Sequence, residues 1–324
     1  MILDPFYFLS KCRRVVKARF EVARYKGELT LANILRVGGG AAFIFLSLSF
    51  GVTGFSLAGG KGGDILVSPP YLIVGAPPPP EVTAASAYVL DPASGFVLYD
   101  KNSACELPPA SATKITTALV ATSYYSLDDV IRVSPDCTFR EGESLMGLFP
   151  GEQLSVRNLL QGMLIASGSD AACALANSYP GGELRFVEEM NAVAVSLGLE
   201  RTHFMNPTGA DEEFHYSTAQ ELVALAREAL GDPFLQETVG MAAANVASAD
   251  GKRWHQLETT NKLLETFPGI LGVKTGYTPK AKEVFVFYFK RDRVELLGAV
   301  MGSDDRFGDA RLLIEWALSS FIFP

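Results

Sequence analysis

Strand-like and helix-like segments follow one another in an order that restricts the fold of residues 83–324. Apolar runs bounded by turn residues are typical of strands, and they lie at the two ends of this region: residues 87–91, 95–99, 270–274, 284–290 and 294–301. Helix-like segments fill the middle and follow the last strand: residues 114–123, 156–165, 170–178, 184–197, 218–230 and 306–321. Tight turns between consecutive strands imply antiparallel pairing. We therefore predict an α+β fold in which two early and three late strands form one sheet.

A charge-free run of 22 residues, Val37–Ala58, precedes this region. A helix of that length spans the ~30 Å hydrocarbon core of a membrane. Residues 1–36 carry eight basic and three acidic side chains, so the positive-inside rule predicts that they stay in the cytoplasm. We predict a single-pass membrane protein with residues 83–324 outside the cytoplasm. Ser56-Leu57-Ala58 also fits a signal-peptide cleavage site, which would export the same residues without an anchor.

Residues 59–82 are rich in glycine and proline, which predicts an extended linker that holds the following domain off the membrane. The net charge of the chain is −8 and that of residues 1–36 is +5, so the remainder carries −13. This acidic balance argues against nucleic acid as a partner.

The cysteines and histidines show no spacing typical of a metal site, so we predict neither a metal nor another cofactor. The histidines are His203, His215 and His255, and the cysteines are Cys12, Cys105, Cys137 and Cys173. We interpret the cysteines as small buried hydrophobic residues rather than as disulfides.

The segment Ser111-Ala112-Thr113-Lys114 places a hydroxyl and an amine three residues apart, where a helix is predicted to begin. Positions i and i+3 share one helix face, so the two groups can meet. A serine hydroxyl needs an adjacent base to act as a nucleophile. A lysine can be that base when burial and a nearby cation favour its neutral form. The spacing alone also fits a capping serine beside a surface lysine.

Two further segments carry candidate groups. Lys274-Thr275-Gly276 ends a predicted strand. There a lysine and a threonine can bind a carboxylate, and a glycine admits a substrate backbone. Ser167-Gly168-Ser169 separates two predicted helices, and a serine there can relay a proton to a leaving amine. Taken singly, each segment also fits an ordinary strand end or turn.

Together and in this order, the three segments resemble the motifs of penicillin-binding proteins and serine β-lactamases. The similarity is greatest to the low-molecular-mass penicillin-binding proteins, the D-alanyl-D-alanine carboxypeptidases, and covers about residues 83–324. It extends to the segments 88–99, 109–114, 165–171, 204–209, 216–219, 260–264 and 272–278. The resemblance implies a transpeptidase-like fold with a helical subdomain beside the sheet. It also implies peptidoglycan stem peptides as substrates and β-lactams as inhibitors.

The same resemblance implies roles for individual residues. The catalytic set is Ser111 as acylated nucleophile, Lys114 as general base and Ser167 as proton relay. Backbone N–H groups of Ser111 and Tyr277 are expected to form the oxyanion hole. The implied substrate-binding set is Ser169, Lys274, Thr275, Gly276, Tyr277 and Arg306, of which Thr275 and Arg306 serve the terminal carboxylate.

The sequence departs from the family pattern at two positions. Ser169 stands where the family usually has an asparagine that donates to a substrate carbonyl, and Lys282 stands where it usually has glycine. Three alternatives to a carboxypeptidase remain open. They are a peptidoglycan endopeptidase, a β-lactamase with Glu183 as a nominal water-activating residue, and a wall-binding protein without activity.

Overall fold

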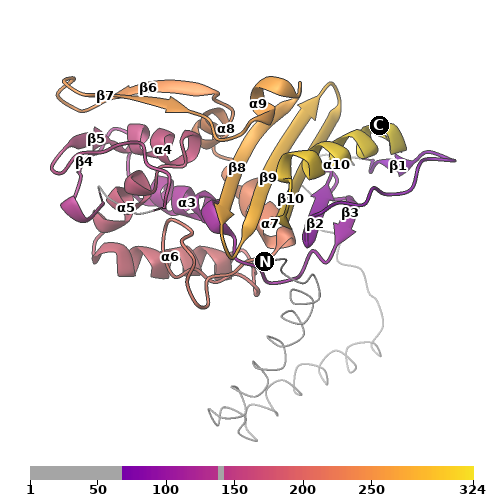
Figure 1. Ribbon diagram of the computed structural model, residues 1–324, viewed down its shortest axis with the longest axis horizontal. Coiled ribbons are helices and arrows are strands. Elements are labelled where there is room, and N and C mark those ends of the chain that lie inside the picture. Colours follow the sequence, from indigo (N-terminus) through magenta and orange to yellow (C-terminus); the bar gives the residue numbers. More distant parts are fainter. Residues whose placement is uncertain (1–67, 138–141) are drawn as a thin grey trace, which may run out of the picture. The chain divides into compact units, whose positions relative to one another are not determined.

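A computed structural model describes residues 68–137 and 142–324. Within these residues an antiparallel sheet of five strands has the order β3-β2-β10-β9-β8 (Figure 1). Its strands are β2 (Ser86–Leu90), β3 (Val97–Lys101), β8 (Ile270–Thr278), β9 (Lys282–Arg291) and β10 (Val294–Ser303). Two early and three late strands thus share one sheet, which confirms the prediction of an α+β fold.

Helices cover both faces of this sheet, which is why its central strands are buried almost throughout. The helix α10 (Arg306–Ser320) packs on β9 and β10, and α7 (Ala219–Ala229) packs on β2 and β10 from the other side (Figure 1). Residues 284–289 of β9 are all buried, as expected for a strand covered on both faces. Three phenylalanines of β9 and the apolar side of α10 form the centre of the core: Phe285, Phe287, Phe289, Leu313, Ile314 and Ala317.

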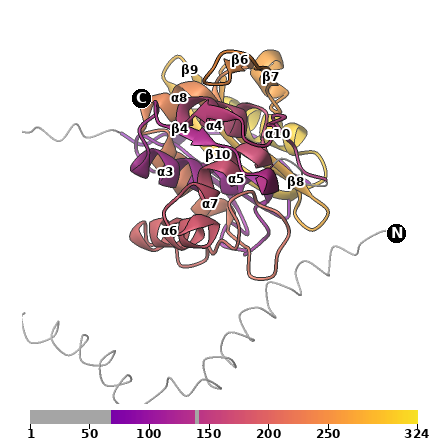
Figure 2. The same cartoon turned by 90° about the vertical axis from the view of Figure 1, so that its left-hand side faces the viewer.

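A helical cluster lies beside the sheet. It contains α3 (Lys114–Tyr124), α4 (Val156–Ile165), α5 (Ser169–Asn177) and α6 (Gly182–Ser196). These helices pack on one another, and Figure 2 shows them in front of the sheet. Capping side chains fix where helices begin. The Ser155 side chain accepts from Asn158 N at the start of α4, and the Thr218 side chain accepts from Glu221 N at the start of α7. The helices expected from the sequence are present, with ends shifted by a few residues.

The sequence patterns did not reveal the short elements. Two hairpins lie outside the main sheet, β4 (Val130–Arg132) with β5 (Gln153–Ser155) and β6 (Ala243–Ala247) with β7 (Trp254–Glu258). A further pair joins β1 (Tyr71–Leu72) to β11 (Phe321–Ile322). The remaining short helices are η1 (Ala110–Thr113), η2 (Pro135–Cys137), α8 (Pro233–Val239) and α9 (Leu263–Thr266). Segments this short carry too few residues for a reliable period, so only tertiary contacts define them.

The interpretation of the cysteines as unpaired hydrophobic residues was wrong, because none of the cysteines in the described residues is free. Cys137, at the end of η2, forms a disulfide with Cys173 of α5, and their Cα atoms are 5.4 Å apart. The two residues are 36 positions apart in the chain, and both are fully buried. That spacing has no recognisable signature, because the pair is created by the way η2 packs on α5.

The predicted segments 1–36 and 37–58 lie outside the described residues. Within residues 68–137 and 142–324, no helix combines the length and apolar character needed to cross a bilayer. Part of the predicted linker is described, and it is attached to the domain. Trp316 Nε1 donates to Pro77 O (3.1 Å), and Lys101 Nζ donates to Val82 O (2.8 Å). We expected residues 71–82 in the linker, whereas they pack on the domain that follows.

Candidate active site

Ser111 and Lys114 lie at the junction of η1 and α3. The helix α3 begins at Lys114, and a 3₁₀ turn over residues 110–113 precedes it, so Ser111 lies one turn earlier than a simple helix start would place it. In a 3₁₀ turn residues i and i+3 lie directly above one another. Accordingly Lys114 Nζ donates to Ser111 Oγ at 3.0 Å. The lysine is fully buried and the serine is partly exposed, as a nucleophile with a sheltered base requires.

The two serines of the second predicted motif each form a hydrogen bond with one of the buried lysines, Lys114 and Lys274. Ser167 lies between the end of α4 and the start of α5, with a positive φ of 59° that turns the chain sharply. Lys274 Nζ donates to Ser167 Oγ at 2.8 Å, and Lys114 Nζ donates to Ser169 Oγ at 3.0 Å. Each buried amine therefore contacts one hydroxyl of this turn, which joins the three motifs in one cluster.

The third motif lies on β8, at the edge of the sheet, and this strand packs against η1. A Cβ atom added to Gly276 would lie 2.9 Å from Ser111 N, so only glycine allows the strand to pass this close. Thr275 is buried, and its Oγ1 shares a 2.6 Å hydrogen bond with Thr260 Oγ1. Tyr277, the next residue, is 64% exposed.

Arg306 reaches the same strand from the first residue of α10. Its Nη1 donates to Gly276 O at 2.7 Å, and its backbone N donates to Glu283 Oε2 at 2.9 Å. Its Nε is buried, with no hydrogen-bond partner among the described residues. The guanidinium thus lies beside the third motif, and its Nε–H donates to none of the described residues.

Positive charge accumulates in this site. Burial lowers the pKa of Lys274 well below its usual value, and the charges of Lys114 and Arg306 lower it further. A proton on Lys114 opposes a proton on Lys274, so the cluster favours the neutral form of Lys274. A neutral amine is the form that can accept a proton from a hydroxyl.

Two residues outside the three motifs fix the positions of the loops that surround the site. Asp170 is buried, and its carboxylate accepts from the backbone N–H groups of Met146, Gly147 and Leu148 at 2.9–3.0 Å. This fixes the loop that packs on the second motif. Gly209 has a φ of +89°, and a Cβ there would lie 1.9 Å from Ala110 O, next to the nucleophile. Both residues fall in segments that resemble the family, but their supporting roles had no separate sequence signal.

His215 is a further residue without a sequence signal. It is buried, its Nε2 is 2.9 Å from Thr113 Oγ1, and its Nδ1 accepts from Met205 N at 3.2 Å. Burial lowers the pKa of His215 to about 4, so the ring is neutral at pH 7. Because Thr113 directly precedes Lys114, this bond ties the nucleophile turn to the 204–216 loop.

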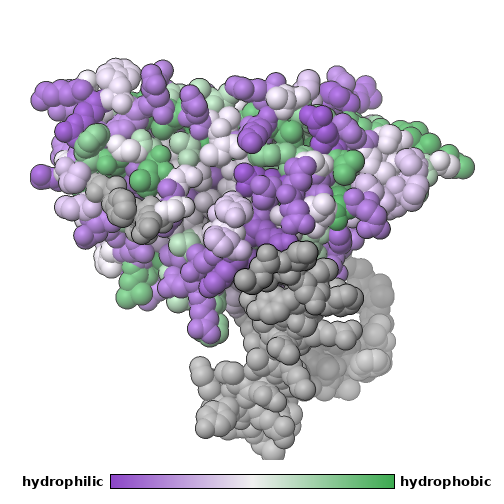
Figure 3. Space-filling model, in the orientation of Figure 1, coloured by the Kyte–Doolittle hydropathy of each residue, from purple (hydrophilic) through white to green (hydrophobic). Residues whose placement is uncertain are grey.

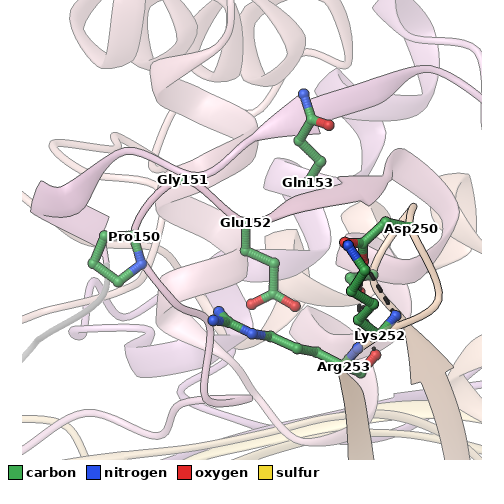
Figure 4. Close-up of a pocket in the computed structure, with 8 residues that line it drawn as sticks. Pro150, Gly151, Glu152, Gln153, Asp250, Lys252 and Arg253 are labelled. Carbon is green, nitrogen blue, oxygen red and sulfur yellow. Dashed lines mark hydrogen bonds and ion pairs between the residues drawn. The ribbon is translucent and has the colours of Figure 1, made fainter.

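A pocket of about 380 Å³ lies elsewhere, between the β4–β5 and β6–β7 hairpins (Figure 4). Glu152 forms part of its wall and shares a buried 2.8 Å hydrogen bond with His255 Nε2. Arg253 crosses the pocket and stacks on Phe149, with 4.2 Å from Cζ to the ring centre. No residue of the three motifs lines this pocket, so it is separate from the serine–lysine cluster.

Comparison with known proteins agrees with this geometry. The family model described as D-alanyl-D-alanine carboxypeptidase, peptidase S11, matches residues 73–305. The chain belongs to this family. The predicted resemblance to the low-molecular-mass penicillin-binding proteins is thereby confirmed.

Individual relatives show how far the likeness extends. D-alanyl-D-alanine carboxypeptidase DacF of Bacillus subtilis is 36% identical over 247 residues, which are 74% of this chain and 63% of that protein. A D-alanyl-D-alanine endopeptidase of Pseudomonas aeruginosa is 32% identical, over 75% of this chain and 82% of its own length. The crystal structure of a D-alanyl-D-alanine carboxypeptidase from Mycobacterium tuberculosis superposes with a TM-score of 0.70 at 31% identity, covering 79% of this chain and 99% of that one.

Proposed function

We propose that this protein is a serine D-alanyl-D-alanine carboxypeptidase that removes the terminal D-alanine from peptidoglycan stem peptides. The observation that carries the proposal is the contact between Ser111 Oγ and the buried Lys114 Nζ, beside the edge strand that bears Lys274-Thr275-Gly276. A partly exposed nucleophile, a buried amine and an open strand edge are what acyl transfer from a peptide requires.

In the first half of the reaction, Ser111 Oγ bonds to the carbonyl carbon between two D-alanines while its proton passes to Lys114 Nζ. The backbone N–H groups of Ser111 and Tyr277 stabilise the oxyanion, since β8 passes within contact distance of Ser111. The C–N bond then breaks, and the departing nitrogen takes the proton that Lys114 accepted, relayed through the Ser167 hydroxyl. D-Alanine leaves, and Ser111 carries the acyl group.

In the second half, a water oxygen bonds to the acyl carbon and gives its proton to the Lys114 amine, which passed on its earlier proton in the first half. The bond from this carbon to Ser111 Oγ breaks, and Ser111 Oγ takes the proton held by Lys114. The shortened peptide is released. A β-lactam acylates the same serine, and its tethered leaving group delays this second half.

The third motif binds the terminal carboxylate of the substrate. Thr275 Oγ1 supplies a hydroxyl at the strand edge, and the Arg306 guanidinium supplies positive charge beside it. The Nε of Arg306, which is buried and has no hydrogen-bond partner among the described residues, lies in the same region. A guanidinium beside a strand edge favours a ligand that ends in a carboxylate.

Ser169 stands where the family usually has an asparagine. Its short side chain accepts from Lys114 Nζ and is 1% exposed. We infer that Ser169 helps to orient the general base, and that the substrate carbonyl at this point has a weaker contact. The change therefore affects substrate preference more than acylation itself.

The site of action is also part of the proposal. The charge-free run 37–58 and the basic residues before it support a membrane anchor that leaves the catalytic domain outside the cytoplasm. That is where peptidoglycan is accessible. The disulfide between Cys137 and Cys173 supports the same location, because disulfides persist in oxidising compartments.

The deciding experiment measures free D-alanine released from a pentapeptide ending in D-Ala-D-Ala, with Ser111→Ala as the control. Release that vanishes in the variant supports the proposal. Fluorescent penicillin on Ser111 without release would instead favour the endopeptidase, which the Pseudomonas relative makes the second candidate. In that case a cross-linked dimer of stem peptides should be cleaved. Absence of both release and labelling would refute catalysis by this site.

A further inference from the structure

Three segments without any charged residue come together at one end of the domain. They are Ser68–Pro80, Pro92–Tyr99 and Trp316–Pro324, which together contain thirty residues. At the 20% charged fraction of the whole chain, about six charges would be expected there. Their absence from three distant stretches that meet in space indicates a surface with a common property.

The contacts between these segments are specific. Tyr71 and Leu72 of β1 pair with Ile322 and Phe321 of β11, and Ile73 N donates to Ser320 O at 2.8 Å. Phe96 then packs edge-on against Phe321, with ring centres 6.2 Å apart. The three segments therefore form one structural unit.

This unit exposes large apolar side chains. We define the apolar tip as Tyr71, Leu72, Val74, Phe96, Val97 and Ile322, whose exposed fractions run from 38% for Phe96 to 100% for Val74. Figure 3 shows the hydrophobic residues at the pointed end of the domain on the right. Exposed apolar residues that occur singly need no explanation, but a contiguous group of six marks a surface that contacts another apolar phase.

The position of the apolar tip in the chain indicates that the apolar phase it contacts is the membrane. Twelve residues separate Ala58, the end of the predicted membrane-spanning run, from Tyr71. A chain of that length reaches at most about 45 Å when fully extended, so an anchor that ends at Ala58 limits how far Tyr71 can lie from the bilayer. The domain is otherwise acidic and is repelled by anionic lipids, whereas the charge-free tip is not. An exposed tyrosine among aliphatic side chains suits the headgroup level.

We propose that the apolar tip rests in the interfacial layer of the membrane and thereby orients the catalytic domain. This proposal depends on the proposed membrane anchor, since the anchor brings the tip to the bilayer. In Figure 1 β1 lies at one end of the domain, and α5, which begins with Ser169, lies toward the other. Seating the tip on the lipid therefore points the serine–lysine cluster away from the membrane, toward the wall.

The test uses the full chain in vesicles of phosphatidylethanolamine and phosphatidylglycerol that contain brominated lipid. The native chain contains Trp254 and Trp316, so each variant is measured against the unsubstituted chain. The emission added by Tyr71→Trp should be quenched about twofold more strongly than that added by the matched variant Tyr124→Trp, because tip residues lie within the ~5–10 Å headgroup boundary. Tyr124 is a suitable control, since it is 50% exposed and lies on α3 in the helical cluster. The Tyr71→Trp emission should also shift to shorter wavelength.

Leu72→Glu with Val74→Glu, added to Tyr71→Trp, should abolish the excess quenching while penicillin labelling and thermal unfolding stay unchanged. Flotation of the vesicles tests the anchor separately. If the chain floats but Trp at position 71 is quenched no more than at position 124, the tip proposal is wrong and the anchor stands. A blue shift without quenching would assign the tip to a second copy of the chain and refute lipid contact. If the chain does not float, both proposals fail.

Discussion

Removing the disulfide between Cys137 and Cys173 gives a prediction whose size follows from the structure. The cross-link closes a loop of 36 residues. In the chain-entropy description, such a loop stabilises the folded state by about 4 kcal/mol at 25 °C, because it restricts the unfolded chain. For a domain of this size that corresponds to a fall in Tm of roughly 10 °C.

The assay compares Cys137→Ala, Cys173→Ala and the double variant by thermal unfolding followed with circular dichroism. Each single variant should lose nearly the full amount, and the double variant should lose little more, since one bond is broken in all three. Fluorescent penicillin labelling of Ser111, measured against temperature, should fail about 10 °C earlier in each variant. The labelling matters because Cys173 lies four residues after Ser169 on α5.

Two results would refute this reasoning. A loss below about 1 kcal/mol would show that the cross-link does not limit the unfolded chain. Additive losses in the double variant would show that packing of two buried side chains, and not the bond between them, is responsible.

Three further predictions concern the site. The pKa of His215 is lowered to about 4, so its neutral form stabilises the fold above pH 6.5. The free energy of unfolding should therefore fall by about 3 kcal/mol as the pH drops from 6.5 to 4. Urea titrations at both pH values should show this dependence, and His215→Gln should remove it. Gly209→Ala places a Cβ 1.9 Å from Ala110 O, so penicillin acylation should slow by about 100-fold. A change below threefold would contradict the close packing. Arg306→Ala removes the bond to Gly276 O and should raise KM for the pentapeptide about tenfold with a smaller effect on kcat. A loss confined to kcat would remove Arg306 from substrate binding.

Local sequence patterns were sufficient for the long elements and for the motif residues. The strand β9 and the helix α4 have enough residues of one period to be recognised, and the predicted bounds of α4 match those observed. Ser111 and Lys114 are three residues apart, so local geometry alone brings them together, whether the turn is 3₁₀ or α. The sequence also predicted that strands at the two ends of the domain would share a sheet.

Tertiary packing decided everything that joins distant residues. The bond between Lys274 and Ser167 connects positions 107 residues apart, and the one between Lys114 and Ser169 connects positions 55 apart. The lowered pKa of Lys274 arises from burial and from two cations contributed by other elements. The disulfide, the β1–β11 pair and the apolar tip have the same origin, since each is made by segments whose own patterns carry no pairing information. A sequence records which side chains are present and their local period, whereas burial and contact between remote segments exist only once the chain has folded.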